Sequence, residues 1–310
     1  MITKKEEQLV IPAVRWKKPR PPRRILAIRL QAMGDLVITL PYLQQLRNSL
    51  PPNTVIDLLT RKEVESIPRH LKLFNRVYSI RGGRNGKKQL LFAVFLIPVL
   101  LFRRYEIVLD LQDNIISRLV MKSLRPRAWS LFDRFSLESA GNRTQATIEA
   151  VGLGNCKPAT RFSITNEQEA IALLKAAGWA GGRLVVLNPA GAFETRHWPL
   201  ENYIQFAHLW LERFPDTQFL VLGTGIIEKR STYIKIEMGD CCISLVNKTT
   251  AAQAFAVLQQ VQLVLSEDSG LMHMAWVSGI PVLAMFGSTE SKKARPLGKH
   301  SRFVDSSDLP

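Results

Sequence analysis

Short runs of branched apolar residues alternate with helical segments along nearly the whole chain, and this alternation restricts the fold more than any other feature. Runs that are apolar throughout are typical of parallel strands covered by helices on both faces. In the first half they predict strands at Ile25–Leu30, Val55–Leu59, Val77–Ile80 and Ile107–Leu111 and helices at Leu36–Ser49 and Asn114–Ser123. A second set contains the runs RLVVLN, TQFLVLG, VQLVLSE and IPVLAMFG. We therefore expect an α/β fold of two Rossmann-like domains with a cleft between them.

The length of 310 residues is too great for one ordinary core and fits two domains. We expect a basic, flexible N-terminal extension over residues 1–23, a first Rossmann-like domain over 24–160, a linker with a helix over 161–182 and a second domain over 183–310. The start has neither the apolar core nor the cleavage site of a signal peptide. Three cysteines, two of them adjacent, fit reduced thiols better than disulfides. These features predict a cytoplasmic protein.

The positive charge of the chain is confined to its first half. Residues 1–160 hold 28 Lys and Arg against 12 Asp and Glu, whereas residues 161–310 hold 14 of each. The whole net charge of +16 therefore lies in the first domain and favours an anionic partner there, with Lys87, Lys88, Arg103 and Arg104 among the basic residues. Charge alone also suggests a nucleic-acid-binding protein, but no recognition motif or platform of stacking aromatic residues accompanies it.

These four basic residues flank one long apolar run, Leu90–Phe102, which contains Pro98. A helix that crosses a bilayer needs about 20 residues, so this run of 13 residues does not span one. Two interpretations stay open. The run is either a buried core helix or an interfacial segment whose flanking cations meet lipid headgroups.

A carboxylate, Asp35, stands at the turn QAMGD between the first expected strand and the helix that follows it. Aspartate near the start of a helix stabilises it, which is the structural explanation. Ligands of open parallel sheets bind beyond the carboxyl ends of the strands, which makes Asp35 a candidate base at the same time.

The segment SEDSGLMHMAW in the second half contains several candidate binding residues together. Asp268, Ser269 and Gly270 connect a strand to a helix, and His273 lies one turn into that helix. Free backbone N–H groups at a helix start suit phosphate, and glycine has no side chain to block its approach. As pure structure, Asp268 or Ser269 caps the helix and His273 is a surface histidine.

Two further turns follow strands of the second half. In NPAGAFETRHWP, Gly191 and Ala192 form a small-residue turn before Arg196, whose guanidinium can bind phosphate oxygens bidentately. In FLVLGTGIIEKR, Glu228 stands where the dinucleotide fingerprint needs its third glycine, which disfavours nicotinamide and flavin cofactors. Glu228 either binds ribose hydroxyls or is a solvated helix residue. No metal-ligand spacing is present in the sequence, so we expect neither a metal nor a cofactor.

Three ordered motifs between Arg24 and Thr289 together resemble glycosyltransferase family nine, the heptosyltransferases that build the lipopolysaccharide inner core. They are QAMGD, PAGAFETRHWP and EDSGLMHMAWVSGIPVLAMFGST. The resemblance implies the B-type glycosyltransferase fold and metal-independent transfer with inversion at the anomeric carbon. It also implies that the first domain binds an anionic, lipid-linked acceptor such as lipid A–Kdo. The second would bind a nucleotide-sugar donor such as ADP-heptose.

The resemblance assigns a role to each matching residue. Asp35 corresponds to the general base, and Arg196, where the family usually has lysine, corresponds to the residue that binds donor phosphate. Glu228 is the match for the ribose-binding acidic residue. The nucleotide diphosphate would be held by Asp268, Ser269, Gly270 and His273.

Two departures from the family pattern and two rival functions accompany this hypothesis. Ser288 stands where the family often has proline, and the chain stops 21 residues after Thr289, so the C-terminal helix that returns to the first domain is expected to be short or absent. The expected protein is a monomeric cytoplasmic enzyme that works peripherally at the inner membrane and binds no nucleic acid. The alternatives are transfer of another sugar to a cell-envelope glycan and a non-catalytic, nucleotide-sugar-binding paralogue.

Overall fold

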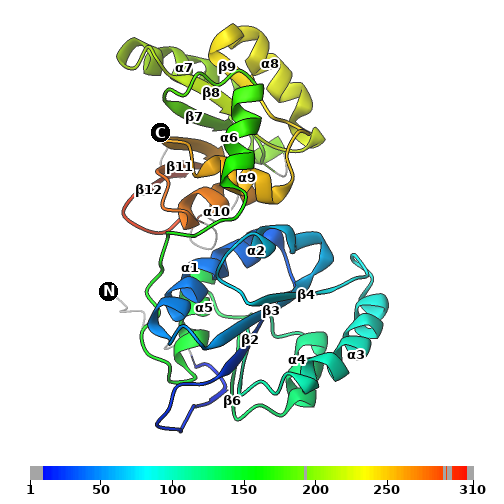
Figure 1. Ribbon diagram of the computed structural model, residues 1–310. Coiled ribbons are helices and arrows are strands. Elements are labelled where there is room, and N and C mark those ends of the chain that lie inside the picture. The colour runs from blue at the N-terminus through cyan, green and yellow to red at the C-terminus, as the bar shows by residue number, and fades with distance from the viewer. Residues whose placement is uncertain (1–9, 192–193, 289–290, 292–294, 306–310) are drawn as a thin grey trace, which may run out of the picture. The chain divides into compact units, whose positions relative to one another are not determined.

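The computed structural model describes residues 10–191, 194–288, 291 and 295–305, and the chain divides into two compact units (Figure 1). The first unit comprises residues 1–65 and 73–159, and the second comprises residues 66–72 and 160–310. Each unit is built on its own six-stranded sheet with helices on both faces. The α/β class and the pair of Rossmann-like units expected from the alternating pattern are confirmed.

The sheet of the first unit has the order β1-β6-β5-β2-β3-β4 and is parallel except for β1, which runs antiparallel to β6. Its strands are β1 (Ala13–Val14), β2 (Arg24–Ile28), β3 (Val55–Arg61), β4 (Arg76–Ile80), β5 (Ile107–Asp110) and β6 (Ala128–Leu131). Helices α1 and α5 pack together on one face, and α3 and α4 on the other. These helices are α1 (Met33–Ser49), α3 (Gly86–Phe102), α4 (Ile115–Leu124) and α5 (Ala140–Glu149), with a short 3₁₀ turn at Lys62–Val64.

The sheet of the second unit is entirely parallel, with the order β12-β11-β10-β7-β8-β9. Its strands are β7 (Leu184–Asn188), β8 (Gln218–Val221), β9 (Cys242–Ser244), β10 (Leu263–Glu267), β11 (Val282–Phe286) and β12 (Ser301–Asp305). Its helices are α2 (Ser66–Arg69), α6 (Glu167–Ala176), α7 (Leu200–Arg213), α8 (Glu228–Met238), α9 (Ala251–Leu258) and α10 (Gly270–Val277), with 3₁₀ turns at Glu194–Arg196, Gly225–Ile227 and Gly239–Cys241. Because all six strands are parallel, they end at the same edge, which is where open sheets of this kind bind their ligands.

The division of the chain differs from the expected boundaries at three places. Residues 13 and 14, expected within a flexible extension, form β1 and pair with Trp129 and Ser130 of β6. The segment 161–182, expected as a linker, belongs to the second unit, where α6 packs against α9. The segment 66–72 also belongs to the second unit, where Leu71 pairs with Ile164. Short pairings of this kind leave no apolar pattern in the sequence, so alternation does not reveal them.

Candidate functional site

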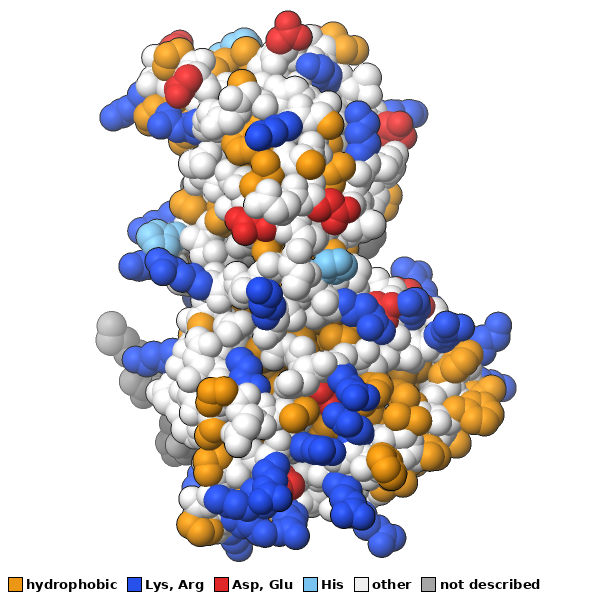
Figure 2. Space-filling view, viewed as in Figure 1, with side chains coloured by type: hydrophobic (Ala, Val, Ile, Leu, Met, Phe, Trp, Pro, Cys, Tyr) orange, Lys and Arg blue, Asp and Glu red, His pale blue; other side chains and the backbone are white. Residues whose placement is uncertain are grey.

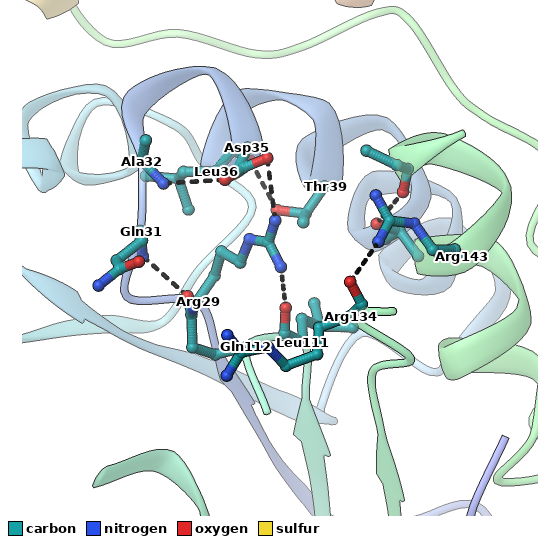
Figure 3. A network of polar contacts seen from close by, with 12 residues as sticks. Arg29, Gln31, Ala32, Asp35, Leu36, Thr39, Leu111, Gln112, Arg134 and Arg143 are labelled. Atoms are coloured by element: carbon teal, nitrogen blue, oxygen red, sulfur yellow. Dashed lines mark hydrogen bonds and ion pairs between the residues drawn. The ribbon is translucent and has the colours of Figure 1, made fainter. Parts of the chain in front are cut away.

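Asp35 lies in the first turn of α1, just beyond the carboxyl end of β2 (Figure 3). The residue that precedes the helix, Ala32, has no side-chain oxygen to cap it, and Asp35 instead accepts a hydrogen bond from the Ala32 N–H through Oδ2, at 3.1 Å. A carboxylate in the first turn is also favoured by the helix dipole. The Asp35 side chain is 44% exposed, so it caps the helix and still faces solvent.

A buried cation, Arg29, lies behind Asp35 at the end of β2. Its Nη2 is 3.2 Å from Asp35 Oδ1, and its Nη1 donates to the backbone carbonyl of Leu111 (Figure 3). The Arg29 side chain is only 5% exposed, and its guanidinium stacks 4.7 Å from the ring centroid of Phe132. Burial lowers the pKa of Arg29 from its ordinary value, and the Asp35 charge opposes that shift. Arg29 therefore fixes one oxygen of Asp35 from inside the unit.

The loop after β5 completes this first cluster. Gln112 Oε1 accepts hydrogen bonds from the backbone N–H groups of Leu30 and Gln31, at 2.9 and 2.8 Å, and so ties the ends of β2 and β5 together. Arg143 of α5 stacks on the ring of Phe132, 4.9 Å from its centroid. The sequence interpretation missed Arg29, although a single charge within the apolar run ILAIRL was a usable signal.

The carboxyl edge of the second sheet is organised by Glu267, a fully buried carboxylate at the end of β10. Its Oε2 accepts from the Gly191 N–H at 2.6 Å, and its Oε1 accepts from the Trp198 N–H at 2.8 Å. Arg230 of α8 donates to the same Oε1 at 2.9 Å. Burial, together with the nearby Glu267 charge, raises the pKa of Tyr203 well above its ordinary value. Glu267 thus holds the segment after β7 against β10, a role that the sequence interpretation also missed.

The turn into α10 has the geometry expected for a helix start. Ser269 caps α10 by accepting from the Met272 N–H at 3.3 Å, and Asn188 donates to Ser269 Oγ at 2.7 Å. Gly270 is exposed and its backbone is not left-handed, and a Cβ added there would meet nothing within 4 Å. Neither the backbone conformation nor the neighbouring atoms therefore require glycine at position 270. Because glycine has no side chain, the start of α10 is open to a ligand.

The other candidate residues of this turn are half-buried. Asp268 precedes the cap, and His273 lies in the first turn of α10, where its Nδ1 accepts from the Trp276 indole at 3.3 Å. That hydrogen bond to Nδ1 sets the orientation of the His273 ring, and the other ring nitrogen, Nε2, takes no part in it.

Loops after β7, β8 and β11 reach the same edge. The backbone of Arg196 ends a 3₁₀ turn, but its side chain and Ala192 lie outside the described residues. Thr195 accepts the Ser288 N–H at 3.3 Å, and their hydroxyls are 2.9 Å apart. A proline at position 288 could form neither contact, so the serine in this chain ties the two loops together.

Glu228 is the exposed first residue of α8 and is located near Asn247, whose amide donates to Glu228 Oε2 at 3.5 Å. The structure therefore places Gly191, Glu228, Ser269 and Gly270 at one edge of the second sheet. Asp35 lies at the corresponding edge of the first sheet, and the two sets are on different units.

The four basic candidates of the first unit lie at the two ends of α3. Lys87 and Lys88 are in its first turn, and Arg103 and Arg104 follow its last residue. Arg103 is partly engaged, because its Nη2 is 3.9 Å from the buried Asp57. Within the described ranges, no group of three or more His, Cys, Asp or Glu residues could hold a metal ion.

Two Rossmann-like units, each with polar groups at the carboxyl edge of its sheet, form the architecture of the B-type glycosyltransferase fold. The model of glycosyltransferase family 9 (heptosyltransferase) matches residues 96–310, which is more than half of the chain. The chain belongs to glycosyltransferase family 9.

Individual relatives agree with this assignment. Lipopolysaccharide heptosyltransferase 3 of Escherichia coli is 21% identical over 287 residues, which are 85% of this chain and 83% of the relative. A family 9 glycosyltransferase from Veillonella parvula superposes with a TM-score of 0.77 at 16% identity, covering 92% of this chain and 86% of that one. The E. coli heptosyltransferase WaaC with ADP gives 0.71 at 18% identity, covering 92% and 94%. The same enzyme with ADP-2-deoxy-2-fluoro heptose gives 0.68 at 19%, covering 91% and 92%. At these identities the structures support the fold.

Proposed function

We propose that this glycosyltransferase moves a heptose from ADP-heptose to a lipopolysaccharide core acceptor of the lipid A–Kdo type, with Asp35 as the general base. The observation that supports the proposal most directly is the state of Asp35. It is a half-exposed carboxylate at the carboxyl edge of the sheet, with one oxygen held by a buried arginine and the other by a backbone N–H. A carboxylate that only caps a helix has no need of a buried cation behind it.

The proposed donor site is the carboxyl edge of the second sheet. The start of α10 offers backbone N–H groups to the diphosphate beside Gly270, and Arg196 adds a positive charge from the loop after β7. Asp268 and His273 complete the diphosphate site, and Glu228 contacts the ribose. The ADP and fluoro-heptose bound to the E. coli relative favour this donor.

In the proposed reaction, Asp35 takes the proton of an acceptor hydroxyl while that oxygen bonds to the anomeric carbon. The bond between this carbon and the diphosphate oxygen breaks, and ADP leaves with the bonding electrons. Attack opposite the leaving group inverts the anomeric centre. The positive guanidinium and the helix start stabilise charge that develops on the diphosphate. Inversion and independence of a metal are the part of the proposal that the family resemblance implies.

The test is transfer from ADP-heptose to a lipid A–Kdo acceptor by the wild type and by Asp35→Asn. Asparagine still accepts the Ala32 N–H but cannot take a proton, so we expect the rate to fall by about 10²–10⁴-fold. The matched control is Asp240→Asn, which changes an exposed aspartate of the second unit and should keep full activity. Both variants should keep the rise in melting temperature that ADP causes.

Two outcomes would contradict the proposal. A variant Asp35→Asn with wild-type turnover would remove Asp35 as the base. A wild type that is stabilised by ADP-heptose, yet transfers nothing to the acceptor, would favour another acceptor or a non-catalytic binding protein.

A further inference from the structure

From Leu90 to Phe102, helix α3 is apolar on every side, yet only one stripe of it is buried. Ala93 and Leu100 are fully buried, and Leu96 and Ile97 pack against the same core between α3 and the sheet. The opposite side faces solvent. Its exposed large side chains are Leu90, Leu91, Phe92, Val94, Phe95, Val99, Leu101 and Phe102, with Phe95 69% and Phe102 86% exposed. We call this side the outer face of α3; Figure 2 shows hydrophobic side chains gathered there, at the right of the view.

This exposure is not explained by the fold. A helix that is apolar all round is normally buried, and a contiguous exposed apolar patch marks an interaction surface. Among the helices in the part of the chain that the structure describes, none is long and apolar enough to cross a membrane. The sequence left open whether Leu90–Phe102 is core or interfacial. The stripe that contains Ala93 and Leu100 packs in the core, whereas the outer face is exposed to solvent.

The charged residues of α3 and the two residues that follow it are all basic. The helix contains no Asp or Glu, and Lys87 and Lys88 lie in its first turn, where the helix dipole disfavours cations. These lysines therefore do not stabilise the helix and need another explanation. Arg103 and Arg104 follow its other end.

A cavity of about 500 Å³ opens at this second end, at the amino edge of the sheet and opposite Asp35. Six arginines line it: Arg23, Arg24, Arg103, Arg104, Arg125 and Arg127. Its one acidic residue, Glu106, is paired with Arg20, whose hydrogen bond holds the pKa of Glu106 below its usual range. Arg103 Nε is buried there without a hydrogen-bond partner. Six arginines against one carboxylate that is already paired make the cavity strongly basic, which favours a phosphate group there.

We propose that the outer face of α3 docks on an anionic lipid bilayer. The helix lies parallel to the membrane with Phe95 and Phe102 in the acyl boundary, Lys87 and Lys88 on lipid headgroups, and a headgroup phosphate in the arginine cavity. A second copy of this chain is the less favourable occupant, because an isologous contact would bring two identical basic clusters together. The inference rests on the proposed function only in that a lipid-linked acceptor lies in such a membrane.

The first experiment measures co-sedimentation of the full chain with phosphatidylcholine vesicles, with and without phosphatidylglycerol. We expect binding to the anionic vesicles that weakens with salt. Phe95→Gln combined with Phe102→Gln should weaken it by about a hundredfold or more, since each buried phenylalanine contributes about tenfold or more. The matched control is Leu209→Gln with Ile236→Gln, which changes exposed apolar residues on helices of the second unit. Equal binding by both double variants would overturn the proposal.

A second pair of variants tests the charge. Lys87→Gln with Lys88→Gln should reduce binding to the anionic vesicles by about tenfold, whereas Lys229→Gln in the second unit should not change it. Sedimentation velocity without lipid tests the other occupant: a dimer that Phe95→Gln dissociates would also overturn the membrane proposal. Failure of transfer from ADP-heptose, with vesicle binding intact, would instead contradict the proposed function and leave this inference standing.

Discussion

Arg29 Nη2 lies 3.2 Å from Asp35 Oδ1, so a buried cation orients the carboxylate in the first turn of α1. The same guanidinium donates to the Leu111 carbonyl and stacks on Phe132. Arg29 therefore joins the end of β2, the start of α1 and the loops after β5 and β6. Because one carboxylate oxygen has this ion pair and the other accepts a backbone N–H, Asp35 has a fixed orientation before any acceptor binds.

The first prediction concerns Arg29→Lys. Lysine keeps the charge but is a single point donor, so it cannot contact Asp35 and the Leu111 carbonyl together. We expect the free energy of unfolding in urea to fall by about 1–3 kcal/mol. The transfer rate should fall through kcat more than through KM, because Asp35 loses its orientation. Arg213→Lys, on the exposed face of α7, is the control. Wild-type stability and kcat for Arg29→Lys would show that the ion pair is incidental.

The second prediction is a pH dependence that comes from Asp110. Burial raises the pKa of Asp110 from 3.8 to about 6. Its Oδ1 accepts two backbone N–H groups, whereas its Oδ2 is buried without a partner among the described residues. Because the folded-state pKa lies above that of the unfolded chain, folding takes up a proton between these values. The free energy of unfolding therefore falls as the pH rises through that range, by about 3 kcal/mol from this group.

Asp110→Asn removes this titration and keeps the acceptor oxygen. We expect the variant to gain stability relative to the wild type as the pH rises from 4 to 7, measured by urea unfolding at each pH. Parallel stability curves for the two proteins would contradict the raised pKa of Asp110.

The alternation of apolar runs was enough to predict the central strands of both sheets, because each central parallel strand is buried on both faces and needs an apolar run. It did not predict β1, β6, β9 or β12. β1 is a two-residue edge strand, and β6 (Ala128–Leu131) is short and partly polar. β9 has three residues and β12 has exposed positions along it, and both are edge strands of the second sheet. The same limit applies to the segment 66–72, whose place in the second unit depends on long-range pairing.

The candidate site was predictable where a turn residue stands out of its pattern, as Asp35 and Gly270 do. Arg29 and Glu267 were missed because both are fully enclosed by the fold and act through other residues. A sequence shows a charge at a strand end, but the backbone groups that meet it come from segments up to 82 residues away, as with Leu111. Only the folded chain brings those groups together.

The third prediction concerns Glu267→Gln. The Gln amide nitrogen cannot accept a hydrogen bond, so either the Gly191 N–H or the pair of donors at Oε1 loses its acceptor in a fully buried place. We expect a loss of about 1–3 kcal/mol in the free energy of unfolding and a smaller rise in melting temperature with ADP. Glu212→Gln, an exposed change on α7, is the control. An unchanged response to ADP would mean that the loop after β7 does not form the donor site.

The last prediction separates stability from ligand binding at Gly270. A Cβ there would meet nothing within 4 Å, and alanine is the better helix former, so Gly270→Ala should melt at or above the wild-type temperature. If the diphosphate approaches the start of α10, the added methyl group or the larger side chain of Gly270→Val blocks it. We then expect ADP affinity, measured by calorimetry, to fall by about tenfold or more. Gly298→Ala is unsuitable as a control because its backbone is left-handed, whereas Gly86→Ala in the first unit has equal open space and no left-handed backbone. If Gly270→Val binds ADP as tightly as Gly86→Ala does, the diphosphate does not lie at this helix start.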